Sequence, residues 1–268
     1  MANMAHKTTI KTLYKMKQEG EKIATLTAYD ASFARIIDEQ GVDVILVGDS
    51  LGMVIQGHDT TIPVTVDDMI YHTRTVARQC KKALLMVDLP FMSYTSPHQA
   101  VENAARLMQE GLAQMVKLEG GALQAETVRK LSHYGVPVCA HLGLQPQSVH
   151  KQGGYRVQGK DQKSALQMIE DAVVLQDVGA DALLLECVPN LLAQEISSNL
   201  SIPTIGIGAG PHCDGQVLVL HDMLGITPSA PRFTKDFLQQ NGNIAEAIKN
   251  FVTAVKEGTF PEDKHCFI

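Results

Sequence analysis

Five successive aliphatic runs in this chain each end at or near an ionisable residue. In chain order, these residues are Asp49, Asp88, Glu119, His141 and Glu186. Lys117 stands two positions before Glu119 in the same run. Burying several charged groups together costs free energy unless they pair with one another or bind a cation. The succession therefore predicts one shared polar site.

The carboxylates of Asp49, Asp88 and Glu119 are an oxygen-only set of candidate metal ligands. Oxygen ligands suit Mg²⁺, which usually takes few protein carboxylates and keeps positions for water and substrate. A zinc site more often recruits several His or Cys side chains, and none cluster in this sequence. We therefore expect Mg²⁺ at these three residues.

A divalent ion with open positions can chelate a 2-oxo acid and polarise its carbonyl group, which acidifies the proton on the neighbouring carbon. In such a site Lys117 would neutralise developing negative charge. Glu186, outside the metal set, would be the base if its apolar neighbours raise its pKa. This chemistry is enolisation, followed by formation or cleavage of a carbon–carbon bond.

Each residue taken alone has a simpler interpretation. An aspartate at a strand end, such as Asp49 or Asp88, often caps the following helix. His141 would then be a satisfied histidine of the core or its rim, and Glu186 a solvated loop residue.

Two further motifs carry weaker signals. The segment GIGAG (206–210) resembles glycine turns that bind phosphate in barrels, but it lacks the G-x-G-x-x-G spacing of a dinucleotide site. Cys187 has no sequence neighbour that would activate a thiol, so we expect it to be inert.

Eight short aliphatic runs alternate with amphipathic segments along the chain. The runs cover residues 23–30, 42–49, 83–90, 115–120, 136–143, 180–187, 202–210 and 215–222. Short runs rich in Val and Ile are typical of strands buried on both faces of a parallel sheet. Helical patterns cover residues 31–41, 65–80, 96–111, 123–135, 163–179, 190–200 and 243–258.

This alternation predicts right-handed βα units that close into an α/β fold, the (β/α)8 TIM barrel, with an open doubly wound sheet as the alternative. Side chains alternate along a strand, so Lys117 and Glu119 share one face. If such faces point into the barrel, the ionisable groups meet at the mouth formed by the C-terminal strand ends. The longest predicted loops, 50–64 and 144–162, follow strands at that mouth.

The chain has 268 residues and a mass of 29.1 kDa, without a composition shift or flexible linker. We therefore expect one barrel domain over residues 1–268, with a short N-terminal extension at 1–7. The formal net charge is −6, so the chain lacks the excess of basic residues that is typical of nucleic-acid-binding proteins. The sequence holds neither an apolar run of membrane-spanning length nor a signal-peptide pattern, so no membrane partner is expected. Five scattered cysteines without a C-x-x-C pair favour a reducing, cytoplasmic location.

Ten segments spread in order over nearly the whole chain resemble one enzyme family, the ketopantoate hydroxymethyltransferases, also called 3-methyl-2-oxobutanoate hydroxymethyltransferases. They are TAYD (27–30), VGDSLGM (47–53), QGHDTTIPVT (56–65), DLPFMSY (88–94), VKLEGG (116–121), HLGLQPQSV (141–149), GGYRVQG (153–159), LLECVP (184–189), GIGAG (206–210) and DGQVLVLHD (214–222). The departures from the family pattern are Gln145, where Thr is usual, the ending HCFI and the N-terminal extension. None of these departures involves the residues of the expected site.

The resemblance implies a barrel of the phosphoenolpyruvate/pyruvate type and a reaction in pantothenate and coenzyme A biosynthesis. In that reaction a hydroxymethyl group passes from the co-substrate 5,10-methylenetetrahydrofolate to 3-methyl-2-oxobutanoate, which gives 2-dehydropantoate. Small-molecule substrates and a homodecamer of two stacked pentamers are also implied. The alternatives are a magnesium-dependent C–C lyase or phosphonomutase of the same superfamily, and a non-catalytic binding barrel.

The resemblance also assigns roles to residues of this sequence. The Mg²⁺-site carboxylates of the family are matched by Asp49, Asp88 and Glu119. Contacts to the 2-oxo acid are matched by Asp49, Ser50, Asp88 and Lys117, with His141 as a further active-site residue. Glu186 matches the proton acceptor. No aromatic clamp or pterin motif for the folate is legible in the sequence.

Overall fold

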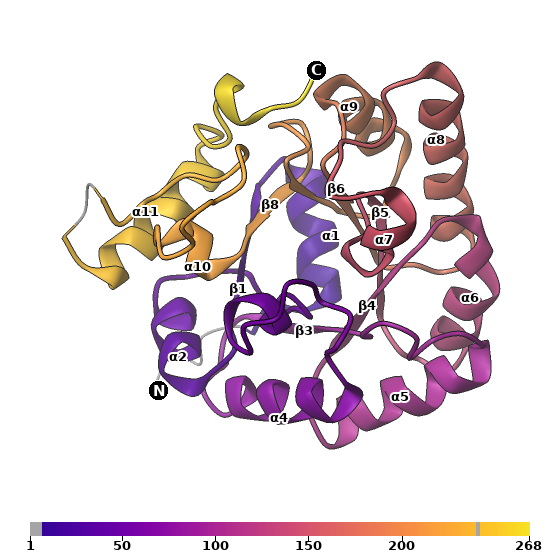
Figure 1. Cartoon of the computed structure of the whole chain (residues 1–268), viewed down its shortest axis with the longest axis horizontal. Coiled ribbons are helices and arrows are strands. Elements are labelled where there is room, and N and C mark those ends of the chain that lie inside the picture. The colour runs from indigo at the N-terminus through magenta and orange to yellow at the C-terminus, as the bar shows by residue number, and fades with distance from the viewer. Residues whose placement is uncertain (1–6, 240–241) are drawn as a thin grey trace.

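A closed barrel of eight parallel strands forms the centre of the protein (Figure 1). The computed structural model describes residues 7–239 and 242–268. The strands are β1 (Ile23–Thr27), β2 (Val44–Val47), β3 (Leu84–Asp88), β4 (Met115–Glu119), β5 (Val138–Gly143), β6 (Ala182–Glu186), β7 (Thr204–Ile207) and β8 (Gly215–Leu218). Each strand pairs with the next and β8 pairs with β1, so the predicted barrel is confirmed and the open-sheet alternative is wrong.

The helices are α1 (Ile10–Glu19), α2 (Ala31–Glu39), α3 (Leu51–Val54), α4 (Val66–Ala77), α5 (Pro97–Gln109), α6 (Ala125–His133), α7 (Val149–Gln152), α8 (Gln162–Asp177), α9 (Asn190–Asn199), α10 (Leu220–Met223) and α11 (Ile244–Lys256). Most of the longer ones surround the barrel and cover the outer face of its strands, whereas α1 lies behind the centre of the ring (Figure 1). Short 3-10 turns are η1 (Ala122–Gln124), η2 (Pro146–Ser148) and η3 (Asp263–His265). All seven predicted helical segments are present.

Local signals in the sequence start several of these helices. Asp30 caps α2 by accepting hydrogen bonds from the backbone N–H groups of Ser32 and Phe33. Thr65 and Asp68 form the capping box of α4, in which each side chain accepts from the other residue's backbone N–H group. Such caps satisfy N–H groups that have no partner within the helix.

The structure differs from the sequence prediction at both ends of the barrel repeat. Helix α1 precedes β1 and buries Leu13 and Met16, but it lies outside the strand–helix alternation that guided the prediction. The predicted eighth strand, 215–222, is too long, because β8 ends at Leu218 and the chain turns into α10. Of the predicted extension at 1–7, residues 1–6 lie outside the described residues.

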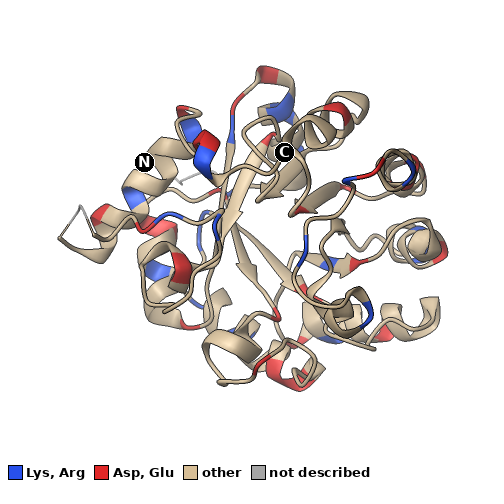
Figure 2. Cartoon of the chain, turned by 45° about the horizontal axis from the view of Figure 1, so that its top comes forward, with Lys and Arg blue, Asp and Glu red and all other residues tan. Residues whose placement is uncertain are grey.

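The strands are buried along almost their whole length, because the barrel interior covers one face and the helices the other. Charged residues lie mainly on the outer helices, where both signs are mixed, and at the ends of several strands (Figure 2). All five cysteines are free and buried. Within the described ranges, no helix combines the length and apolar character needed to cross a membrane.

Candidate active site

A cavity of about 780 Å³ opens at the end of the barrel where the strands have their C-termini. Every residue that the sequence analysis placed in the site lines this cavity: Asp49, Ser50, Asp88, Lys117, Glu119, His141 and Glu186. The strand register brings them together, because Asp88 of β3 pairs with Lys117 of β4, and Glu119 of β4 pairs with His141 of β5.

Lys117 and Asp88 form a buried ion pair at the floor of the cavity. The Lys117 Nζ atom lies 2.9 Å from Asp88 Oδ1, and the two side chains are 5 % and 3 % exposed. Burial alone would lower the pKa of Lys117, but the carboxylates of Asp88, Glu119 and Asp49 outweigh it and raise this pKa. Lys117 is therefore a permanent cation at the centre of the site.

Gln147, in η2, connects two of the carboxylates. Its Nε2 donates to Asp49 Oδ2 at 2.8 Å and to the Leu89 carbonyl at 2.9 Å, and its backbone N–H donates to Glu119 Oε2 at 3.1 Å. The Tyr94 hydroxyl donates to Gln147 Oε1 at 2.5 Å, which fixes the orientation of the amide. The loop after β5 is thereby fastened to the ends of β2 and β4.

Neither Asp49 nor Asp88 caps the helix that follows it. Asp88 Oδ2 accepts from the Asp49 backbone N–H at 3.0 Å. The N-cap residue of α3 is Ser50, which makes no side-chain cap bond, and the N-cap residue of α5 is Ser96, which caps that helix by accepting from the Gln99 backbone N–H. The helix-cap alternative for these two aspartates is therefore wrong.

The buried carboxylates resist ionisation. Burial, and then the neighbouring Asp88, raises the pKa of Asp49 to about 7. Burial also raises the pKa of Glu119 well above its ordinary value, although Lys117 opposes the shift. The single positive charge of Lys117 does not neutralise the buried carboxylates of the site. A further cation bound at the floor of the cavity would therefore be stabilised by them.

His141 lies between Lys117 and Glu186. Its Nδ1 atom is 3.3 Å from Lys117 Nζ, and because an ammonium group can only donate, Nδ1 must be the acceptor. Burial, and then the charge of Lys117, lowers the pKa of His141 well below its usual range, so the ring is neutral. We therefore assign its proton to Nε2, which faces Glu186 Oε2 at 3.4 Å.

Glu186 ends β6 and is the most accessible carboxylate of this group, with a side chain 16 % exposed. Burial raises its pKa to about 8, against the opposing effect of Lys117. A carboxylate with a pKa in this range can take up a proton near neutral pH. The simpler interpretation of Glu186 as a solvated loop residue is wrong, because it belongs to a strand and lines the cavity.

The donor chemistry at the cavity floor fits a divalent cation. Glu119 Oε1 is buried and accepts no hydrogen bond from the described residues. No group of three His, Cys, Asp or Glu side chains in the described part of the chain is arranged as a ready-made metal site. Mg²⁺ commonly uses only one or two protein carboxylates and completes its shell with water and substrate, so a preformed set of three is not required. The three-ligand set stays a prediction.

The two weaker motifs have structural explanations. Gly208, in the GIGAG turn, has a φ of +61°, and a side chain there would meet Phe233 at 2.9 Å and Phe267 at 3.1 Å. Close packing against these aromatic rings explains why glycine stands at this position, so a phosphate-binding role is not needed to explain it. Burial, and then Glu186, raises the pKa of the Cys187 thiol, as expected for an inert cysteine.

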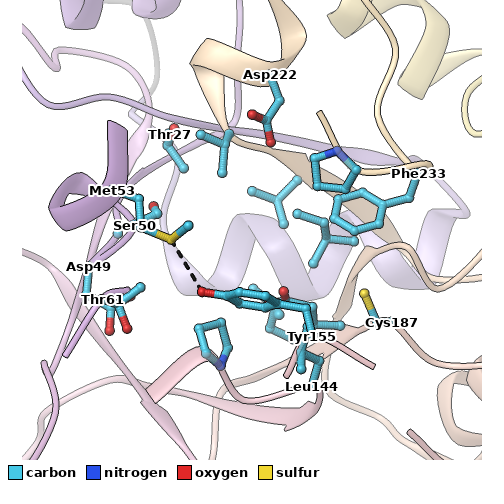
Figure 3. Close-up of a pocket in the computed structure, with 18 of the residues that line it drawn as sticks. Thr27, Asp49, Ser50, Met53, Thr61, Leu144, Tyr155, Cys187, Asp222 and Phe233 are labelled. Atoms are coloured by element: carbon cyan, nitrogen blue, oxygen red, sulfur yellow. Dashed lines mark hydrogen bonds between the residues drawn. The ribbon is translucent and has the colours of Figure 1, made fainter. Parts of the chain in front are cut away.

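Several cavity residues were not identified from the sequence. Tyr155 reaches across the cavity, and its hydroxyl lies 3.5 Å from Met53 Sδ (Figure 3). Asp222 points into the cavity from the opposite wall, and Phe233 lines another part of the same cavity (Figure 3). Gln147, Tyr155 and Asp222 all lie within segments that carry the family resemblance, but single helical turns and loops are too short to have a periodicity that would mark them as functional.

Comparison with known proteins identifies the family to which the chain is similar over nearly its whole length. The family model described as ketopantoate hydroxymethyltransferase matches residues 7–263. A 3-methyl-2-oxobutanoate hydroxymethyltransferase of Halorhodospira halophila is 57 % identical over 97 % of this chain and 94 % of its own length. The protein of the same name from Nitrosococcus oceani is 59 % identical over 94 % of this chain and 96 % of its own.

Solved structures share the fold at much lower identity. A 2,3-dimethylmalate lyase, a member of the PEP mutase/isocitrate lyase superfamily, superposes with a TM-score of 0.57 at 14 % identity, covering 88 % of this chain and 89 % of the lyase. A phosphoenolpyruvate phosphomutase from Streptomyces platensis gives 0.62 at 12 % identity, with 88 % of each chain covered. These likenesses show that the chain shares the barrel fold of these enzymes.

Proposed function

Because the chain belongs to the ketopantoate hydroxymethyltransferase family, we propose that it transfers a hydroxymethyl group from 5,10-methylenetetrahydrofolate to 3-methyl-2-oxobutanoate. The products are 2-dehydropantoate, for pantothenate and coenzyme A biosynthesis, and tetrahydrofolate. The observation that carries the proposal is the buried constellation of carboxylates, Lys117 and Glu186 at the C-terminal mouth of a barrel matched to this family.

We propose Mg²⁺ as the ion at the cavity floor, held by Asp49, Asp88 and Glu119 directly or through water. The excess of buried carboxylates and the unpartnered Glu119 oxygen support this assignment. When bound, the ion supplies a Lewis acid that polarises the 2-oxo group.

The residues of the chain then have separate tasks. Lys117, fixed as a cation beside Asp88, would attract the negative 2-oxo acid, and the Ser50 hydroxyl, 2.8 Å from Tyr29 Oη, would help to orient it. Glu186 would take the proton from C3 of the acid. Nε2 of the neutral His141 lies 3.4 Å from Glu186 Oε2 and makes no hydrogen bond to the described residues, so it would hold the base in position by closing onto Glu186.

The carbon–carbon bond forms between C3 and the methylene carbon of the folate, and both bonds of that carbon, to N5 and N10 of the folate, break. Water supplies the hydroxyl oxygen and one proton, and the proton removed from C3 balances the other, so that both nitrogens end as N–H groups. The proton on Glu186 must leave before the next turnover. A carboxyl group with a pKa of about 8 returns a proton readily at neutral to mildly alkaline pH.

A C–C lyase or phosphonomutase is the less favoured function. The structures with those names are 12–15 % identical to this chain and share its fold, whereas the hydroxymethyltransferases are more than 50 % identical over nearly its whole length. A lyase nucleophile would need an activated thiol, and the raised pKa of Cys187 disfavours one there.

The test is product analysis by NMR with 3-methyl-2-oxobutanoate, methylene-¹³C-labelled 5,10-methylenetetrahydrofolate and saturating Mg²⁺. We expect 2-dehydropantoate with the label in its hydroxymethyl carbon. Absence of this product, or folate-independent cleavage of the acid, would refute the proposal.

We also propose a homodecamer of two pentamers that works in the cytoplasm. Large apolar side chains on the outer surface, such as Leu123, Leu191 and Tyr71, support burial by other copies of the chain. Five free cysteines support a reducing compartment. A mass near that of the monomer in light scattering would refute the assembly.

A further inference from the structure

The cavity extends well beyond the carboxylate floor. A five-carbon 2-oxo acid fills only a small part of about 780 Å³, and much of the remaining wall is apolar and aromatic, with Met53, Tyr155 and Phe233 among its residues (Figure 3). Such walls suit a flat ring system. The upper part of the cavity therefore has the size and surface for a second, larger substrate.

One buried carboxylate lies in this upper part, away from the floor. Asp222, on α10 directly after β8, is only 7 % exposed and points into the cavity (Figure 3). Its Oδ1 accepts a hydrogen bond from Thr227 Oγ1 at 2.5 Å. Among the described residues, no hydrogen-bond donor reaches its Oδ2.

Asp222 Oδ2 is not one of the buried atoms that lack a partner, so it is open to the cavity and free to accept from a ligand. Burial of the side chain raises the pKa of Asp222, although the hydrogen bond from Thr227 opposes the shift. A ligand with two adjacent N–H donors would satisfy it by a pair of charge-assisted hydrogen bonds. The pterin ring of a folate has such an edge, formed by N3–H and the 2-amino group.

The charges at the cavity opening fit the other end of the same molecule. Arg156 and Arg232 line the cavity and are exposed to solvent. A folate carries its glutamate carboxylates at the end opposite the pterin, so one molecule could place its donor edge on buried Asp222 and its carboxylates near these arginines.

We propose that Asp222 recognises the N3–H and 2-amino edge of the folate's pterin ring and thereby orients the co-substrate over the 2-oxo acid. The proposal rests on the proposed function for the identity of the co-substrate. Its role is binding and positioning, because Glu186 and the cavity floor carry the proton transfer.

The test compares Asp222→Asn with the control Thr227→Val. Asparagine keeps the size of the side chain and an oxygen that can accept from Thr227, but it presents an N–H group or a neutral oxygen to the donor edge. We expect the KM for 5,10-methylenetetrahydrofolate and the Kd for tetrahydrofolate, measured by calorimetry, to rise about 10- to 100-fold. The Kd for 3-methyl-2-oxobutanoate should stay within about twofold of wild type.

The control removes the hydroxyl partner and leaves the carboxylate in place. In Thr227→Val, folate binding should change by less than about threefold. An equal loss in both variants would show that Asp222 only supports its loop, and unchanged folate binding in Asp222→Asn would also overturn the inference.

A ligand variant tests the pairing directly. A tetrahydrofolate analogue with methyl in place of the 2-amino group should bind wild type more weakly but bind Asp222→Asn as well as tetrahydrofolate does; an equal loss in both proteins would refute the pairing. These titrations need no turnover. A wild-type chain that binds tetrahydrofolate through Asp222 but forms no 2-dehydropantoate would refute the proposed function and leave this inference standing.

Discussion

Replacing Glu186 with glutamine should stop proton removal from the 2-oxo acid and, at the same time, stabilise the fold. Both effects follow from the burial of this carboxylate, which raises its pKa from 4.5 to about 8. Glutamine keeps the shape of the side chain and an oxygen that can face His141 Nε2, but it cannot accept a proton from carbon. Substrate binding should therefore be preserved.

The expected size of each effect can be worked out. Loss of a positioned general base costs about 10²- to 10⁴-fold in rate, or about 3–5 kcal/mol of barrier. For stability, the folded chain binds more protons at Glu186 than the unfolded chain between pH 4.5 and about 8, so its free energy of unfolding falls as pH rises through that window. Glutamine removes a cost of up to about 5 kcal/mol above that window.

The assay is the loss of the C3 proton signal of 3-methyl-2-oxobutanoate in deuterated water, followed by ¹H NMR with Mg²⁺ present. Melting curves of the metal-free proteins at pH 6 and pH 8.5 report the stability. Glu195→Gln, an exposed change on α9, is the matched control and should alter neither measurement. Exchange at the wild-type rate in Glu186→Gln would assign the base elsewhere, and a lower melting temperature at pH 8.5 would refute the argument from burial.

Three further substitutions test other parts of the site. Asp88→Ala should weaken Mg²⁺ binding at least tenfold in a calorimetric titration, since it removes a proposed ligand; an unchanged titration would contradict this. Lys117→Met should lower the free energy of unfolding in urea by about 3–5 kcal/mol without metal, because it leaves Asp88 buried without its cationic partner. Mg²⁺ should recover part of this loss of stability. A loss that Mg²⁺ does not reduce would count against a cation at this position. Gly208→Ala should cost about 1–3 kcal/mol more in urea unfolding than Gly20→Ala, because both glycines have positive φ but only Gly208 has a neighbour, Phe233, within 3 Å; equal costs would refute the packing explanation.

The barrel and the floor of its cavity could be predicted because each strand carries its own signal. A buried parallel strand must be aliphatic along its length, so a carboxylate at its end, such as Asp88, interrupts the pattern visibly. Closure of the barrel then brings residues of neighbouring strands together, as the register of Asp88 with Lys117 shows. Helix α1 was not predicted, because it precedes the first strand and does not belong to the strand–helix repeat.

The parts of the site that follow the strands could not be predicted in the same way. Gln147 binds the carboxylates through an amide and a backbone N–H group, and neither the residue type nor its loop position marks it in the sequence. Asp222 follows β8 in a run that continues the strand pattern, and only the turn into α10 directs it into the cavity. Such positions depend on loop geometry, which sequence periodicity does not encode.

The most direct test of the account is a crystal structure of the chain with 3-methyl-2-oxobutanoate and Mn²⁺ in place of Mg²⁺, since the anomalous signal of manganese locates the ion. We expect the ion at the cavity floor among the oxygens of Asp49, Asp88 and Glu119, with the acid beside Lys117 and its C3 facing Glu186. An ion bound elsewhere, or an acid whose C3 points away from Glu186, would contradict the account.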